Sequence, residues 1–102
     1  MQTVQDYLSH KPPGYLHDPV LCADGFRVST QASNGHYCEP REDTGPWSQV
    51  ELGFPSADPG EVIRAYAEDP AQPTDTVYPY VPIELVEALI AQHGGIVQAE
   101  KV

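Results

Sequence analysis

The chain has 102 residues, of which 40% are hydrophobic and 20% charged, so it is long enough for one small folded domain and too short for two. Its 15 acidic and 5 basic residues give a formal charge of −10, which opposes direct binding of nucleic acid or of an anionic membrane. We therefore expect a charged partner to be a protein with a basic surface. The alternative is that the acidity only keeps the chain in solution.

The two cysteines, Cys22 and Cys38, are too few for a disulfide framework. No apolar run approaches the roughly 20 residues that span a membrane, and the first residues lack the basic and apolar stretches of a secretory signal. We expect a cytoplasmic protein with reduced thiols and no contact with a membrane.

Residues 1–19 are predicted to form a short helix followed by an extended arm. Thr3 and Asp6 have the spacing of a capping box at the start of a helix over residues 3–9. Two β-prone runs, residues 20–22 and 26–30, flank Ala23-Asp24-Gly25, and an Asp-Gly pair in this setting predicts a hairpin.

Residues 31–46 are rich in Ser, Asn, Gly, Pro and acids, which predicts a long loop with a short strand at residues 36–38. Residues 47–54 form the best strand, in which Val50, Leu52 and Phe54 would share one face. Residues 61–67 fit both a helix and a strand, and the turn signals on either side favour the strand.

A further strand is expected over residues 76–81, with Tyr78 and Tyr80 on one face. Pro79 cannot donate a ladder hydrogen bond, so this strand should lie at a sheet edge, where strand addition can form a homodimer. Helical spacing of apolar residues predicts a helix over 82–93, capped by Gly94 and followed by a frayed tail at 98–102.

These elements predict a single α+β domain over residues 1–102. Its core would be a small antiparallel β-sheet of three to five short strands with the C-terminal amphipathic helix packed on one face. Residues 39–87 hold 11 acids against Arg41 and Arg64. Carboxylates displayed on loops in this way can imitate the phosphates of a nucleic acid.

The candidate interaction residues combine such acids with aromatic side chains, a composition common at protein interfaces. They are Glu39, Glu42, Asp43, Glu51, Glu68, Asp69, Asp75, Tyr37, Trp47, Tyr78 and Tyr80. The alternative is that the acids are solvated and that Trp47 and the two tyrosines of residues 76–81 belong to the core.

Cys22, His36 and Cys38 are the best candidates for zinc ligands, with Glu39 or His17 completing the set. No C-x-x-C pair supports this, and we expect neither a metal nor another cofactor. A Cys–His nucleophile pair is the catalytic alternative, but no motif marks an oxyanion hole or a nucleotide-binding loop, so an enzyme is not expected.

Several short patches over the last two thirds of the chain resemble a group of small phage and prophage proteins of unassigned function. The patches are Gly35-His36-Tyr37-Cys38-Glu39-Pro40-Arg41, Gly45-Pro46-Trp47, Phe54-Pro55-Ser56, Tyr66-Ala67-Glu68-Asp69-Pro70, Thr76-Val77-Tyr78 and His93-Gly94-Gly95. The resemblance implies a viral or mobile-element origin and the cytoplasm of an infected or lysogenic bacterium. Small acidic phage proteins are often inhibitors of bacterial machinery, such as anti-CRISPR or anti-restriction proteins.

The resulting hypothesis is a non-enzymatic, phage-encoded inhibitor that occludes the nucleic-acid-binding surface of a host defence complex. The alternative is a virion structural or assembly protein, or a homo-oligomeric accessory protein with a small-ligand pocket between subunits.

Overall fold

The structure, a computed structural model, describes residues 3–9 and 19–97. The expected extended arm at 10–18 and the frayed tail at 98–102 lie outside the described residues. The elements, in chain order, are α1 (Val4–Leu8), β1 (Val20–Leu21), β2 (Arg27–Gln31), β3 (Gln49–Gly53), α2 (Glu61–Arg64), β4 (Val77–Pro82) and α3 (Ile83–Gln92).

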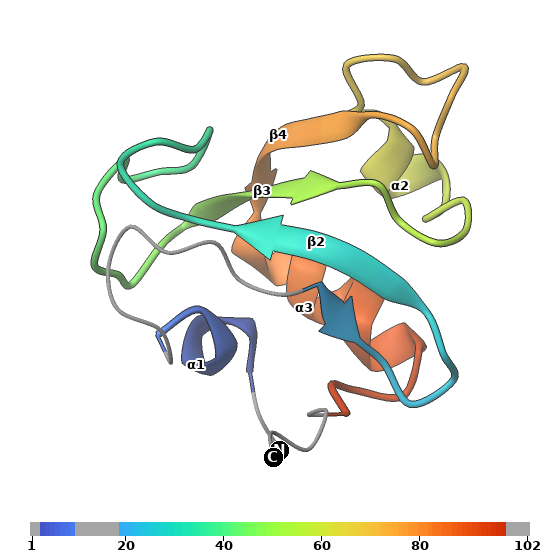
Figure 1. The fold of residues 1–102 in the computed structure, drawn as a ribbon, viewed down its shortest axis with the longest axis horizontal. Helices are drawn as coiled ribbons and strands as arrows, with labels where there is room; N and C mark the ends of the chain where they lie inside the picture. Colours follow the sequence, from blue (N-terminus) through green and yellow to red (C-terminus); the bar gives the residue numbers. More distant parts are fainter. Residues whose placement is uncertain (1–2, 10–18, 98–102) are drawn as a thin grey trace.

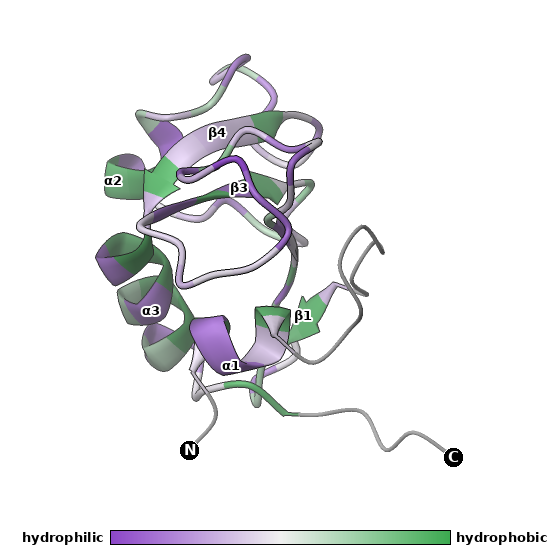
Figure 2. Cartoon of the chain, turned by 90° about the vertical axis from the view of Figure 1, so that its left-hand side faces the viewer, coloured by the Kyte–Doolittle hydropathy of each residue, from purple (hydrophilic) through white to green (hydrophobic). Residues whose placement is uncertain are grey.

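The four strands form one antiparallel sheet in the order β1-β2-β3-β4, with α3 packed against it (Figure 1). The predicted α+β fold class is therefore confirmed. The apolar side of α3 turns toward the sheet and its polar side faces outward (Figure 2). Val86, Leu89 and Ile90 from α3 are buried in one core together with Val50 and Leu52 of β3, and full burial of each such side chain contributes about 1.5–3 kcal/mol.

The predicted hairpin is present, and it also holds the C-terminal end of α3. Gly25 has a φ of 97°, and its N–H donates to the carbonyl of Cys22. The carbonyls of His93 and Gly95 accept hydrogen bonds from the turn of this hairpin, and the His93 imidazole lies 2.7 Å from the Asp24 carboxylate. The predicted C-terminal helix is confirmed to within one residue at each end, and Gly94 takes the expected left-handed conformation after it.

The short N-terminal helix is also confirmed, including its capping box. The Thr3 hydroxyl accepts from the Asp6 N–H, and the Asp6 carboxylate accepts from the Thr3 N–H. The Val4 N–H donates to the Glu87 carboxylate at 3.0 Å, which ties α1 to α3. An aspartate thus fills the position that more often holds Glu or Gln.

The prediction of a strand over residues 61–67 is wrong, because the segment begins with the helix α2. The Asp58 carboxylate favours the helix, because it accepts from the Gly60 N–H at 2.9 Å and pairs with the Arg64 guanidinium at 2.6 Å. These contacts join the two ends of the single helical turn. Only Ile63 of the helix is buried, whereas Val62 is exposed.

Phe54 was expected to point inward from the sheet, but it points outward instead. Phe54 follows β3 with a φ of 49° and is 56% exposed, so it does not share the buried face of Val50 and Leu52. The strand expected over 47–54 is therefore shorter, and residues 36–38 form no strand. An isolated bridge between Glu39 and Gln49 is the only pairing found in that part of the loop.

Tyr78 and Tyr80 do not share a face. Val50 pairs with Val81 and Leu52 with Tyr78, so β4 contains one residue more than β3 between these pairs. This β-bulge places Tyr80 at a φ of 55°, buries Tyr78 completely and leaves Tyr80 38% exposed. The predicted edge position of the strand is confirmed, because β4 is the last strand of the sheet.

Candidate functional site

The connection between β2 and β3, residues 32–48, is named here the acidic loop. It carries Tyr37, Glu39, Glu42, Asp43 and Trp47 of the candidate residues. The loop faces the viewer in Figure 2 and is mostly hydrophilic. Within it, the Asp43 carboxylate accepts from the Asn34 backbone N–H at 3.0 Å and from its side-chain amide at 3.3 Å. These bonds join the two limbs of the loop.

Trp47 is the internal support of the acidic loop and not an exposed anchor. Its side chain is buried, and its indole N–H donates to the Glu42 carbonyl at 3.1 Å. The Gln5 amide of α1 donates to the Trp47 carbonyl at 2.5 Å and accepts from the Trp47 N–H at 3.1 Å. A Cβ at Gly45 would lie 2.6 Å from the indole ring, so only glycine fits there. Trp47 is thus removed from the contact surface.

The prediction that Tyr78 is a contact residue is also wrong. It has no exposed area, and its hydroxyl donates to the Pro73 carbonyl. Burial raises the pKa of this phenol above its usual value. The core alternative therefore holds for Trp47 and Tyr78, while the two other candidate aromatic residues remain at the surface.

Tyr37, Tyr80 and Arg41 form what is named here the aromatic surface. Tyr37 is 45% exposed, and its ring centroid lies 5.9 Å from that of Tyr80. The Arg41 guanidinium lies 5.5 Å from the Tyr37 ring centroid, within the range of a cation–π contact. The Tyr80 N–H donates to the Tyr37 carbonyl at 3.1 Å, and the Glu51 carboxylate accepts from the Tyr37 N–H at 2.9 Å. The surface is therefore fixed by backbone contacts on both sides.

The seven candidate acids fall into two groups at different ends of the molecule. Glu39, Glu42, Asp43 and Glu51 lie in or beside the acidic loop, and Glu68, Asp69 and Asp75 lie between α2 and β4 (Figure 1). Three of these carboxylates accept a hydrogen bond from a backbone N–H. Glu51 accepts from Tyr37, Asp43 from Asn34, and Asp69 from Ala71. Glu39 and Glu42 are exposed and have no side-chain partner among the described residues.

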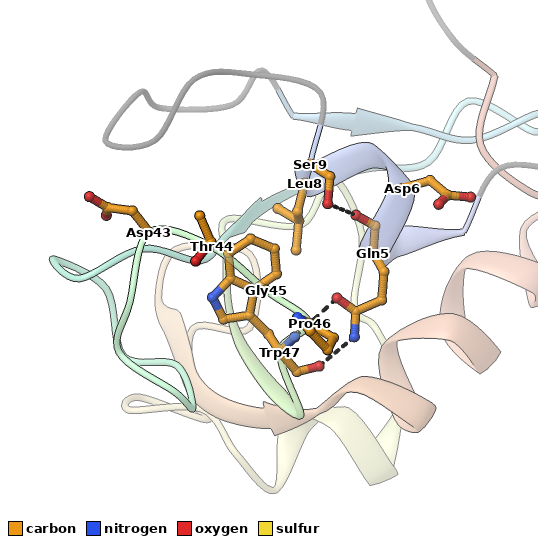
Figure 3. Close-up of a pocket in the computed structure, with 9 residues that line it drawn as sticks. All are labelled: Gln5, Asp6, Leu8, Ser9, Asp43, Thr44, Gly45, Pro46 and Trp47. Atoms are coloured by element: carbon orange, nitrogen blue, oxygen red, sulfur yellow. Dashed lines mark hydrogen bonds between the residues drawn. The ribbon is translucent and has the colours of Figure 1, made fainter.

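A pocket of about 460 Å³ lies between α1 and the acidic loop (Figure 3). Leu8, Pro46 and Trp47 supply its apolar wall, and the loop closes it at Thr44 and Gly45. The sequence gives no signal for this pocket. Gln5 is an unremarkable helix residue until its partner 42 positions away is known.

The three candidate zinc ligands are not brought together. Within residues 3–9 and 19–97, no group of three or more His, Cys, Asp or Glu side chains is placed to hold a metal. His36 bonds the Ser33 hydroxyl at 2.7 Å, and the Cys38 sulfur lies 3.2 Å from the carbonyls of Ser33 and Pro40. Cys22 and Cys38 are free and buried, and burial raises the pKa of both thiols. His17 lies outside the described residues.

The outer edge of β4 is partly occupied by the chain itself. The Val77 carbonyl accepts from the Glu68 N–H at 3.0 Å, and the Tyr80 N–H is taken by Tyr37. Pro79 has no N–H to offer. Few backbone groups are therefore left for the addition of a further strand.

No helix among the described residues has the length and apolar character needed to cross a membrane. Comparison with protein-family models, curated protein sequences and solved structures gave no match.

Proposed function

We propose that the chain is a non-enzymatic binding protein that docks its aromatic surface, with the free acids of the acidic loop, on a basic surface of another protein. The observation that carries this proposal is the exposed Tyr37–Tyr80 pair, held in place by its own backbone. Tyrosines whose positions are fixed before binding lose little conformational entropy when a partner docks on them.

The backbone conformation of Tyr80 supports the same proposal. A left-handed conformation at a residue with a bulky side chain is uncommon and costs roughly 1–2 kcal/mol. Such strain tends to occur at functional sites, because folding alone would favour Gly or Asn at this position. Here it turns an aromatic ring out to solvent beside a second exposed tyrosine.

The charge indicates the kind of partner. Glu39 and Glu42 are exposed near the aromatic surface, and the whole chain carries a charge of −10. A field of this sign accelerates association with a basic protein and repels free nucleic acid. The partner class that fits best is a bacterial complex that binds nucleic acid, and the resemblance to small phage proteins favours a defence complex. The chain would inhibit it by covering the nucleic-acid-binding surface, in the manner of an anti-CRISPR protein in the bacterial cytoplasm.

The test is capture from nuclease-treated bacterial lysate on the immobilised chain, at low and at moderate salt, with bound proteins identified by mass. We expect a nucleic-acid-binding protein to be retained, less so at moderate salt because the attraction is screened. The nucleic acid that the retained protein normally binds should compete with the chain for that protein.

Two charge variants with the same net change provide the control. Glu39→Lys with Glu42→Lys alters the acidic loop, whereas Glu61→Lys with Glu84→Lys alters exposed positions on α2 and α3. We expect the loop pair to abolish capture and the helix pair to reduce it only slightly. An equal loss of capture in both pairs would indicate unspecific electrostatic attraction and would overturn the proposal. Capture that nucleic acid does not compete away would also overturn it.

A further inference from the structure

The acidic loop contains an asparagine followed directly by a glycine. Asn34 is the only asparagine in the chain, and both Asn34 and Gly35 are exposed. In such a pair the backbone nitrogen of the glycine can attack the side-chain carbonyl carbon of the asparagine, because no Cβ hinders the approach. The attack needs a base, since an amide nitrogen becomes a nucleophile only when it gives up its proton.

Two hydrogen bonds connect this nitrogen to an imidazole. The Gly35 N–H donates to the Ser33 hydroxyl oxygen at 3.1 Å, and that oxygen lies 2.7 Å from His36 Nδ1. Because the Ser33 oxygen accepts from Gly35, its own proton is free to bond Nδ1, which is an acceptor in the neutral imidazole protonated at Nε2. Nucleophile, hydroxyl and base therefore lie in one hydrogen-bonded series, the arrangement by which a weak nucleophile is activated.

This series is held in place by the surrounding turn. Ser33 is only 6% exposed, and its carbonyl accepts from the His36 N–H at 3.3 Å. The same carbonyl lies 3.2 Å from the sulfur of Cys38, which is buried in the core. The hydroxyl and the imidazole are thus fixed relative to each other before any reaction, which lowers the entropic cost of proton transfer.

We propose that Asn34 converts spontaneously to aspartate and isoaspartate through a succinimide, and that Ser33 and His36 promote the ring closure in the folded chain. Ser33 passes the Gly35 proton to His36 while the Gly35 nitrogen bonds to the side-chain carbonyl carbon of Asn34. The carbon–nitrogen bond of the side-chain amide then breaks, and ammonia leaves with the proton that His36 held. Water opens the ring at either carbonyl, so the conversion consumes only water.

The conversion changes the contact that joins the two limbs of the acidic loop. The Asn34 side-chain amide donates to the Asp43 carboxylate at 3.3 Å, whereas the product carries a second carboxylate in its place. Two like charges so close to each other repel, and isoaspartate also lengthens the backbone by one carbon. The limbs should therefore separate, and the change is permanent because the ammonia has been lost.

The test incubates the folded chain at neutral pH and follows residue 34 by peptide mapping with mass spectrometry, which separates asparagine, succinimide, aspartate and isoaspartate. Ser33→Ala and His36→Gln remove the proton relay, while Ser33→Thr keeps a hydroxyl. We expect the first two variants to react at least about tenfold more slowly than the natural chain, and Ser33→Thr to keep most of the rate. Circular dichroism would verify that all three are folded.

Three further comparisons accompany these variants. Gly35→Ala should suppress the conversion, because its Cβ hinders the attack while meeting only the Ser33 hydroxyl at 3.8 Å in the folded loop. The capped peptide acetyl-Ala-Ser-Asn-Gly-His-Tyr-amide has the same residues without the fold and should react more slowly than the folded chain. Asn34→Asp and Asn34→Ala both remove the amide, but only Asn34→Asp places a carboxylate opposite Asp43, so it should melt at the lower temperature.

The outcomes decide the proposal without reference to a partner. A folded chain that keeps its asparagine while the peptide converts would overturn it. Equal rates in the natural chain, Ser33→Ala and His36→Gln would overturn it too, since the relay would then have no effect. Equal melting temperatures of Asn34→Asp and Asn34→Ala would exclude repulsion by Asp43 as the consequence. The inference does not rest on the proposed function, and each can fail while the other holds.

Discussion

The backbone N–H of Tyr80 donates to the carbonyl of Tyr37 at 3.1 Å, and the two rings lie 5.9 Å apart. This relationship joins a β-bulge at the sheet edge to a loop more than 40 positions earlier in the sequence. Because the bulge turns Tyr80 outward, the same feature that interrupts the strand creates the aromatic surface.

Phe54 should be a site of stored backbone strain. It has a φ of 49° and is largely exposed, so it gains little from burial to offset a left-handed conformation. We expect Phe54→Gly to raise the free energy of unfolding by about 0.5–1 kcal/mol, measured by urea denaturation. Val62→Gly, at an exposed helix position, should lower it by roughly 0.3–0.5 kcal/mol, because valine is a better helix former than glycine. A destabilised Phe54→Gly would mean that the ring makes contacts that outweigh the strain.

Gly45 should tolerate no side chain. A methyl group there would meet the Trp47 ring at 2.6 Å, so we expect Gly45→Ala to lower the free energy of unfolding by about 1–3 kcal/mol. The matched control is Gly35→Ala in the same loop, where the added Cβ would meet only the Ser33 hydroxyl at 3.8 Å. Tryptophan fluorescence during denaturation measures both. Equal stability of the two variants would show that the loop repacks around Trp47.

The pair of Asp24 and His93 should make stability depend on pH in the acid range. A hydrogen bond from the Phe26 N–H, and then the His93 imidazole, lower the pKa of the Asp24 carboxyl. A carboxyl with a lowered folded pKa stabilises the protein above its unfolded pKa of about 3.9, and this contribution is lost as pH falls through the folded value.

We therefore expect Asp24→Ala to be less stable than the natural chain at pH 7, with the difference shrinking as the pH falls below the unfolded pKa of about 3.9 and through the lower folded pKa. Urea denaturation at several pH values measures it. Asp75→Ala, at an exposed loop position, is the control and should leave stability at pH 7 unchanged. A difference that stays constant down to pH 2 would exclude ionisation of Asp24 as its source.

The two thiols should react slowly while the protein is folded. Cys22 and Cys38 are buried, and burial raises the pKa of each, so few thiolates are present near neutral pH. We expect iodoacetamide to modify neither within the time that labels both in guanidinium chloride, as followed by mass spectrometry. Rapid labelling of the native chain would indicate local opening at these positions.

The elements that were predicted correctly are those whose signals are local. The capping box at Thr3, the Asp24-Gly25 turn and the apolar spacing of α3 each lie within a few residues of the structure that they specify. The helix α2 was predicted as a strand because its sequence fits both, and the Asp58–Arg64 contact that favours the helix is made by a residue before the segment. The short apolar pattern of residues 61–67 is compatible with both a helix and a strand.

The candidate site was predicted only in part, because its geometry depends on distant contacts. Residue type identified Tyr37 and Tyr80 as contact candidates, but their proximity follows from the register of β3 and β4. Trp47 was selected for the same reason, as an aromatic residue near acids, and is nevertheless buried. The role of Gln5 carries no signal, since a glutamine in a short helix is common and its partner lies 42 residues away.

The hydrogen bonds between Gln5 and Trp47 make the acidic loop depend on α1. A helix of five residues is not stable alone in water, so α1 persists only while it is docked. When it undocks, the loop loses its internal support at the same moment, and the two segments should open as one cooperative unit. Amide protons of Tyr7 and Trp47 should then exchange with solvent at a common rate, and ligands that tighten the loop should slow the exchange of both.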